Sequence, residues 1–303
     1  MKKTLLLSVL SLILHSAVAQ DNASSADSLG KVLLSVGRND YAERIKILKE
    51  LYELYSAGDL PSALGVARLH MQTAEKACMD DQIAEAAGNI GYTLYMQGHN
   101  DSALFFLNRA LTIYVRLSAD EEAAVTKNNI ANIFRMTAQY DTSLVLYNEL
   151  LDYYESTGDK SKTAQVLSNI GSLYYTAGNQ EKAKEYTLMS LASQRKTGDA
   201  RSLAVSLVNL VVFSLNNSEF EEGIKYGDEA ISLLKDIDRN YYAAALIRTG
   251  YCYYNTGKKE KALEYNRIAL DIYKENNNSK GMMEAYRTQG DYLYDMKRYS
   301  EAR

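Results

Sequence analysis

The sequence predicts an all-α protein, a right-handed α-α superhelix in which antiparallel helical hairpins stack as a solenoid. A residue that is usually small recurs at intervals of 40, 40, 40, 40, 39 and 40 residues: Leu51, Gly91, Ala131, Gly171, Val211, Gly250 and Gly290. A second one follows in constant step: Ala63, Ala103, Ser143, Ala183, Gly223, Ala262 and Ala302. The 303 residues include a single Pro, which suits a helical chain because Pro breaks helices. A fixed period of this length indicates a solenoid, whose hairpins bury their apolar faces by stacking.

The first 19 residues have the pattern of a secretory signal peptide. Lys2 and Lys3 precede an apolar run over residues 5–14, and a small-x-small site ends at Ala19. The run is too short to span a bilayer, which needs about 20 residues. We therefore expect cleavage after Ala19, a periplasmic or secreted product in a bacterium, and no membrane insertion after cleavage.

Residues 20–26 are small and polar, and we expect a disordered linker there. Residues 27–36 have the apolar spacing of one short helix, which we expect to cap the open face of the first hairpin, as solenoid ends require.

Residues 41–303 are expected to form seven hairpins, the last one incomplete. First helices are expected near 41–57, 82–97, 121–137, 161–177, 201–217, 240–256 and 280–296, and second helices near 61–77, 101–117, 141–156, 181–196, 220–236 and 260–275. The seventh second helix would begin just before Arg303. We therefore interpret the sequence as a fragment, and expect its incomplete last repeat to self-associate through bare apolar side chains.

The fourth unit carries a resemblance to a known family. The run Asn169-Ile170-Gly171 with Tyr174, followed by Gly178, Ala183 and Leu191, resembles the tetratricopeptide repeat. The resemblance covers about residues 41–303, although the period exceeds the usual ~34 and Thr-Gly-Asp triplets replace the terminal Pro. The longer repeats resemble those of kinesin light chains, spindle-orientation adaptors and periplasmic regions of bacterial sensory proteins. This implies a binding function, and in the sensory proteins a histidine kinase or helix-turn-helix output.

Other functional classes find no support in the composition or in motifs. The net charge is −4 and no basic run occurs, so a nucleic-acid partner is not expected. Beyond the leader, the only histidines are His70 and His99, neither of which has a partner at metal-ligand spacing. We expect no catalytic residues, metal or cofactor, and therefore no enzyme. The Gly223-x-x-x-Gly227 pattern is interpreted as close helix packing.

The candidate binding residues follow one register of the first helices. Two positions before the small residue stand Asn89, Asn129, Asn169 and Asn209, and then Arg248. The family resemblance places this position in the concave groove. A carboxamide donates and accepts hydrogen bonds at once, so this row could hold the backbone of an extended peptide. The alternative is that these Asn residues satisfy groups of their own or neighbouring helices.

The helix over residues 201–217 is apolar on two faces, and a helix of this kind is either buried or carries a recognition surface. We expect Val208, Val212 and Leu215 to form the floor of a pocket, with Asn169, Asn209 and Arg248 at its rim and Tyr175 and Tyr251 as walls. The alternative is that neighbouring parts of the solenoid cover this stripe. The function expected is a non-enzymatic scaffold or sensor region binding a protein or peptide in the cell envelope; the alternative is a small-ligand sensor domain of a truncated signal-transduction protein.

Overall fold

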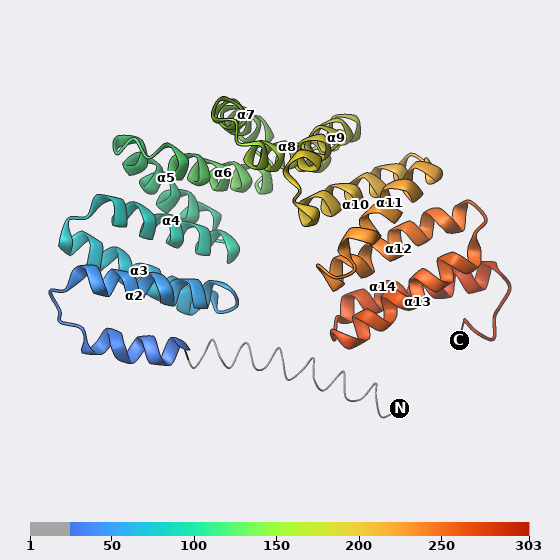
Figure 1. Cartoon of the computed structure of the whole chain (residues 1–303), viewed down its shortest axis with the longest axis horizontal. Helices are drawn as coiled ribbons and strands as arrows, with labels where there is room; N and C mark the ends of the chain where they lie inside the picture. Colours follow the sequence, from blue (N-terminus) through green and yellow to red (C-terminus); the bar gives the residue numbers. More distant parts are fainter. Residues whose placement is uncertain (1–24, 303) are drawn as a thin grey trace. The chain divides into compact units, whose positions relative to one another are not determined.

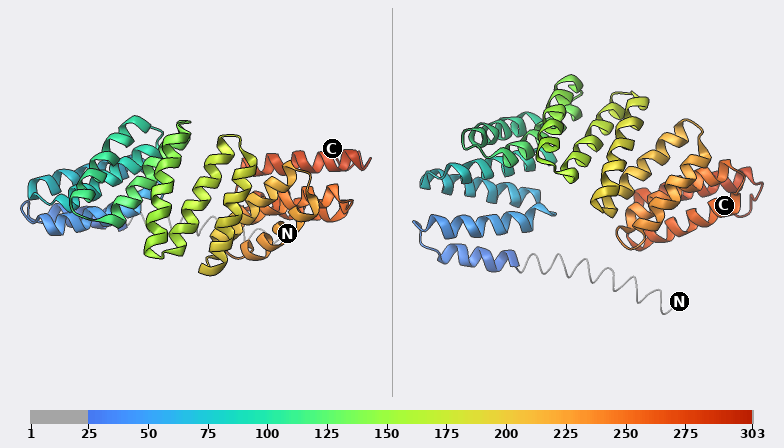
Figure 2. Two further views of the ribbon diagram at one scale, coloured as in Figure 1. Left: turned by 90° about the horizontal axis from the view of Figure 1, so that it is seen from above. Right: turned by 45° about the horizontal axis from the view of Figure 1, so that its top comes forward.

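The computed structural model describes residues 25–302, and the described chain is helical apart from short connections, with no strand in that range. It divides into two compact units, residues 25–153 and 154–302. The predicted signal peptide, residues 1–19, and residues 20–24 of the predicted linker lie outside the described residues. The all-α solenoid class is confirmed, because consecutive helices pack as antiparallel neighbours within each unit (Figures 1 and 2).

The helices begin and end within two residues of the predicted ranges. The first helices of the hairpins are α2 (Tyr41–Ser56), α4 (Asp80–Met96), α6 (Asp120–Met136), α8 (Lys160–Thr176), α10 (Ala200–Asn216), α12 (Arg239–Asn255) and α14 (Ser279–Asp295). The second helices are α3 (Leu60–Ala77), α5 (Asn100–Arg116), α7 (Tyr140–Thr157), α9 (Gln180–Thr197), α11 (Phe220–Leu234) and α13 (Lys259–Glu275). The boundary between the two units falls within α7.

An additional helix precedes α2, and residues 25–35 of it are described. This corrects the predicted linker, since residues 25 and 26 belong to the helix. The physical reason is burial: Ala26 packs against Ile47 and Leu51 of α2, so the helix is extended by one apolar contact that the small, polar composition concealed.

Small residues bring the two helices of a hairpin together, as the repeat pattern predicts. A Cβ on Gly91 would lie 2.6 Å from Cγ of Leu107, and one on Gly171 would lie 3.0 Å from Oγ1 of Thr187. In the third hairpin Ser143 uses the same proximity, because its hydroxyl donates to the main-chain oxygen of Ala131 at 2.8 Å. Bulk at these positions would force the helix axes apart.

In most hairpins, the turn between the two helices contains a residue whose backbone has the left-handed conformation. Gly98, Gly178 and Gly257 have φ of 81°, 83° and 85°, and Ala138 and Lys297 take the same conformation at 59° and 60°. A left-handed residue after a helix satisfies the last carbonyls and reverses the chain. Between hairpins an Asp often caps the following helix: Asp159 and Asp199, for example, accept from the main-chain nitrogens of Lys162 and Ser202.

The glycine pair on α11 marks close packing, as predicted. A Cβ on Gly227 would lie only 2.1 Å from Oγ1 of Thr249 on α12, and one on Gly223 would lie 2.6 Å from Sγ of Cys252. The two helices therefore approach each other along the glycine face. Among the described helices, none has the length and apolar character needed to cross a membrane.

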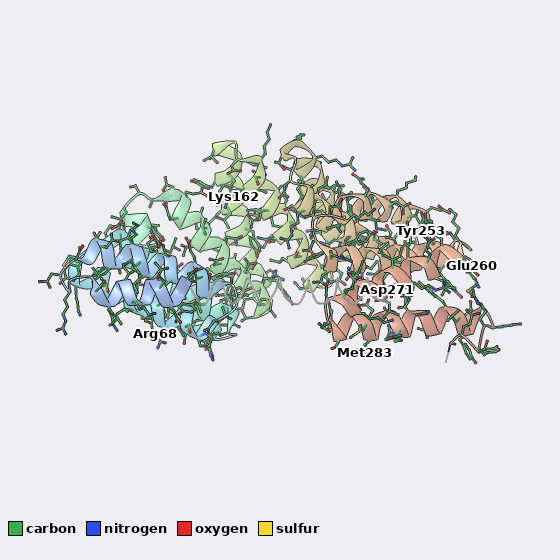
Figure 3. All side chains as sticks on the ribbon, turned by 60° about the horizontal axis from the view of Figure 1, so that its bottom comes forward. Arg68, Lys162, Tyr253, Glu260, Asp271 and Met283 are labelled. Atoms are coloured by element: carbon green, nitrogen blue, oxygen red, sulfur yellow. The ribbon has the colours of Figure 1, made fainter. Side chains whose placement is uncertain are left out.

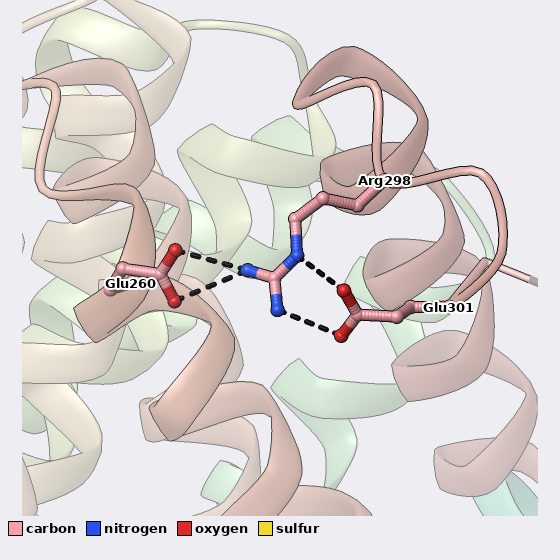
Figure 4. A network of polar contacts seen from close by, with 3 residues as sticks. All are labelled: Glu260, Arg298 and Glu301. Atoms are coloured by element: carbon pink, nitrogen blue, oxygen red, sulfur yellow. Dashed lines mark hydrogen bonds and ion pairs between the residues drawn. The ribbon is translucent and has the colours of Figure 1, made fainter.

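Polar networks join consecutive helices at the end of the second unit. The Tyr253 hydroxyl on α12, labelled in Figure 3, donates to Asp228 of α11 and accepts from Nζ of Lys261 on α13 at 2.7 Å. After α14, the Arg298 guanidinium bridges Glu260 of α13 and Glu301, as Figure 4 shows. The contact between Arg298 and Glu260 holds the chain that follows α14 against α13.

Candidate functional site: the face of the first helices

The Asn row is present on the first helices, one residue per helix in each unit. Asn89 and Asn129 lie on α4 and α6 in the first unit, and Asn169 and Asn209 lie on α8 and α10 in the second. Arg248 occupies the same register on α12. All five side chains are half-buried, so each has contact with both its own solenoid and solvent.

The carboxamides differ in how the protein itself uses them. Within residues 25–302, the side chains of Asn89, Asn129 and Asn209 make no hydrogen bond, whereas Asn169 has a partner inside the molecule. The main-chain oxygen of Asn89 accepts from the Tyr52 hydroxyl at 3.2 Å and from Thr93 Oγ1 at 2.8 Å. At three positions, therefore, the donor and acceptor of the side chain remain available to another molecule.

A cavity of about 320 Å³ opens beside Asn169, between α8, the end of α9 and the start of α10. One face of α8 contributes Ser161, Gln165 and Ser168 to its lining. The end of α9 contributes Gln194 and Thr197, and the following turn and α10 contribute Asp199, Arg201, Ser202 and Val205. Most of these side chains can form hydrogen bonds, so the cavity can recognise a polar group.

Gln194 is the polar residue of this cavity that the sequence analysis missed. It is 4% exposed, and its Oε1 atom is buried without a hydrogen-bond partner. The repeat register contains a signal that could have found it, because the equivalent positions of the other second helices are buried Ala, Leu or Tyr residues: Ala74, Tyr114, Tyr154, Leu234 and Tyr273. A carboxamide at this position departs from the pattern of the core.

Of the two charged residues at the rim of the cavity, Asp199 and Arg201, only Arg201 is in an ion pair within the described part of the chain. Asp199 caps α10, and hydrogen bonds from the Ser202 side chain and main chain lower the pKa of its carboxyl, which keeps it ionised at neutral pH. The Arg201 guanidinium donates to Asp238 at 2.8 Å, at the start of the next first helix. Its positive charge is therefore matched within the protein, and the Asp199 carboxylate remains as a negative charge at the rim.

A second cavity, of about 260 Å³, occupies the equivalent place between α12, α13 and α14. Arg248 lines it in the position that Asn169 has in the first cavity, and Tyr273 takes the place of Gln194. Asn169 and Arg248 therefore line two different cavities. Two repeats separate their helices, and that both residues contact one bound partner stays a prediction.

The apolar stripe of α10 is only partly a surface. Val208 is 3% exposed and lies in a core cluster with Leu207, Leu210 and Leu234, so it does not form the floor of an open pocket. Burial follows from the position of α10, which packs against α9, α11 and α12 at once. Val212 and Leu215 remain half-buried, and Leu215 packs against the cluster around Val211.

The two tyrosines predicted as walls have different surroundings. Tyr175 is 48% exposed and meets Phe213 of α10 edge-on, with ring centroids 5.9 Å apart. Tyr251 is half-buried and packs edge-on against Tyr292, with its hydroxyl 3.5 Å from Thr288 Oγ1. Tyr175 thus offers a free aromatic surface, whereas Tyr251 mainly joins α12 to α14.

Among residues 25–302, no group of three or more His, Cys, Asp or Glu side chains is placed to hold a metal ion. The polar and aromatic side chains of this face can form hydrogen bonds with a partner and pack against it.

Comparison with known proteins identifies the repeat. Two tetratricopeptide repeat models match the chain, over residues 122–196 and 244–276. No curated protein sequence matches it. Among solved structures, the apo form of the quorum sensor NprR from B. thuringiensis has 18% sequence identity and a TM-score of 0.72, covering 98% of this chain and 83% of that one.

Two further solved structures are similar. A Rap protein complexed with Competence and Sporulation Factor has 12% identity and a TM-score of 0.58, covering 100% of this chain and 99% of that one. BtubC from P. vanneervenii has 15% identity and a TM-score of 0.64, covering 72% and 92%. At these identities the likeness shows the fold.

Proposed function

Because the chain is a solenoid of tetratricopeptide repeats, we propose that it is a non-catalytic module that binds an extended segment of a partner protein along its first helices. The observation that carries the proposal is the half-buried Asn side chains on the first helices of each unit, three of which have no hydrogen bond within the described residues. An extended peptide presents alternating N–H and C=O groups, and a carboxamide can pair with either.

The size of the cavities supports a peptide rather than a compact ligand. Small-molecule pockets are typically ~300–1,000 Å³, so the volume of about 320 Å³ is at the lower limit of this range and that of about 260 Å³ is below it. Each is large enough for a side chain of a peptide that continues along the neighbouring helices. The solved Rap complex with Competence and Sporulation Factor supports this use of the fold, since that protein holds a ligand on a similar solenoid.

We expect Asn129→Ala to weaken peptide binding and to raise stability. Ala is the better helix former by roughly 0.5 kcal/mol, and the carboxamide of Asn129 gives up no hydrogen bond within the described residues. Loss of one hydrogen bond to the peptide corresponds to a roughly five-fold lower affinity. Fluorescence polarisation with peptides selected from a random phage library measures the affinity, and urea unfolding measures the stability.

Asn132→Ala is the matched control on the same helix. Asn132 Oδ1 accepts from the buried Tyr147 hydroxyl at 2.8 Å, so its removal should cost about 1–3 kcal/mol of unfolding free energy. If Asn129→Ala also destabilises the protein, the alternative is right and the Asn row is structural. If no library peptide binds the unmodified protein, the proposed function fails.

We also propose that the module acts in the bacterial cell envelope, and the support for this is the leader pattern of residues 1–19. When the protein is expressed in a bacterial host, we expect to recover it from the periplasm with the mass of a chain that begins at Gln20. A chain that keeps Met1 and stays in the cytoplasm would contradict export.

Self-association through the last repeat stays a prediction. The exposed side chains Met283, Tyr286 and Tyr294 of α14 support it, since each is more than half exposed. Sedimentation velocity measures the oligomeric state, and a monomer at all concentrations would contradict the prediction.

A further inference from the structure

We propose that the cavity between α8, α9 and α10 is a subsite for a primary carboxamide, the side chain of a Gln or Asn residue in the bound peptide, and that Gln194 is the residue that recognises it. This inference rests on the proposed function and specifies one position of the partner.

The first argument is that Gln194 is an isolated acceptor in a core position. Its Oε1 atom is buried and unpartnered, and the Gln194 residue is one of those that line the cavity. The equivalent positions in the other second helices avoid this problem with Ala, Leu or Tyr. A buried polar atom without a partner destabilises a protein, and departures of this kind from the core pattern are expected at functional sites.

The second argument concerns the charge of the group that Oε1 can accept from. A ligand carboxylate would place negative charge beside Oε1, which is itself an acceptor, and near the ionised Asp199. An ammonium group would have to lose its bound water on entering the cavity, and no unpaired carboxylate among the described residues lines the interior to replace that water. Asp199 is exposed at the rim, and Asp238 is paired with Arg201. A neutral N–H donor has neither penalty.

The third argument selects a carboxamide among neutral donors. Its NH₂ group can donate to Gln194 Oε1, while its oxygen can accept from Gln165 or Ser168, which line the same cavity. The volume of about 320 Å³ equals roughly ten water molecules at ~30 Å³ each, which is enough for one such side chain and the backbone that carries it.

The test uses two capped tripeptides as probes, acetyl-Gly-Gln-Gly-N-methylamide and its Glu counterpart, titrated into the mature full-length chain labelled with ¹⁵N at Gln. The N-methylamide cap leaves the Gln side chain as the sole primary carboxamide. We expect the Gln peptide to shift the side-chain signal of Gln194 with a Kd of about 1 mM, and the Glu peptide to bind at least roughly ten-fold more weakly.

Two variants assign the effect. Gln194→Met should abolish the preference for the Gln peptide and raise Tm by roughly 2–6 °C, because an apolar side chain of similar shape removes the unpaired acceptor. Gln194→Leu introduces the residue found at the equivalent position 234. It should have the same effects on peptide preference and Tm, and it serves as a second variant if Met packs poorly. Gln180→Met, on an exposed residue at the start of α9, is the control and should change neither property.

Equal binding of the two tripeptides, no Gln194 shift at tens of millimolar, or a fall in Tm for both Gln194 variants would overturn the inference. A failure here with library peptides still bound leaves the proposed function standing. Failure of the library peptides alone, with the tripeptide preference intact, would overturn the extended binding mode and keep the subsite.

Discussion

Val208→Asp should lower the unfolding free energy of residues 154–302 by roughly 4 kcal/mol, whereas Val212→Asp, one turn further along α10, should cost less than about 1 kcal/mol. Val208 is enclosed by Leu207, Leu210 and Leu234, so an introduced carboxylate would be buried without a partner. Val212 is half-buried, and a carboxylate there can reach water. Hydrogen exchange measured by mass spectrometry on α10 fragments would report the difference locally.

Peptide binding also distinguishes position 212 from position 208. Val212→Asp should abolish binding of a library peptide while helicity is retained, if the peptide crosses the accessible part of the α10 stripe. Full affinity in the folded Val212→Asp protein would move the site elsewhere. A loss of stability as large as that of Val208→Asp would show that the whole stripe is core.

Val208→Asn is the matched control for charge, because it has the shape of Asp but does not titrate. Burial raises the folded-state pKa of the introduced carboxyl above its unfolded value of about 3.9. Proton binding then favours the folded state at low pH, so the gap between Val208→Asp and Val208→Asn should narrow as pH falls from 7 through the folded-state pKa. A gap that stays constant over this interval would show that charge is not the cause.

The outcome at α10 shows how far a sequence can define a surface. Helical periodicity separates residues of opposite faces, and the face of α10 that carries Leu207 and Leu210 is buried. It does not say how many neighbouring helices a first helix contacts. Because α10 packs against α9, α11 and α12, its buried arc is wide enough to include Val208. Periodicity therefore predicted the fold and the helix boundaries better than the width of the exposed face.

Gly227→Ala should destabilise the same unit by about 1–2 kcal/mol. The new Cβ would lie 2.1 Å from Thr249 Oγ1 and 2.6 Å from its Cγ2, so α11 and α12 would have to separate. Overpacking of this kind costs about 1–3 kcal/mol and occasionally more, and the clash involves a fully buried side chain. The better helix propensity of Ala offsets up to about 1 kcal/mol. Urea unfolding followed by circular dichroism measures the net effect.

Gly290→Ala is the matched control in the same unit. No atom lies within 4 Å of the Cβ it would add, so only helix propensity changes and the protein should gain up to about 1 kcal/mol. Thr249→Ala combined with Gly227→Ala should recover much of the loss, since it removes the two nearest atoms. If the single Gly227→Ala substitution is neutral, the helices are free to separate and the glycine pair has no packing role.

Gly227 and Gln194, on the second helices of neighbouring repeats, illustrate two kinds of information in the repeat pattern. The repeat register identifies positions, and the residue that departs from its register marks where something local is required. Gly227 could be interpreted from its spacing to Gly223, because close packing of helices has a known pattern. Gln194 could not, because only the structure shows that its Oε1 is unpartnered and that a cavity adjoins it.

Helices α2 to α6 in the first unit and α8 to α14 in the second pack mainly on the helices that directly precede and follow them within that unit. Contacts of this kind have low contact order, so little loop entropy is lost before a contact forms, and folding can begin at any hairpin and spread to its neighbours. A solenoid whose hairpins fold onto their neighbours can fold progressively from its N-terminal hairpins while the remainder of the chain is still being delivered.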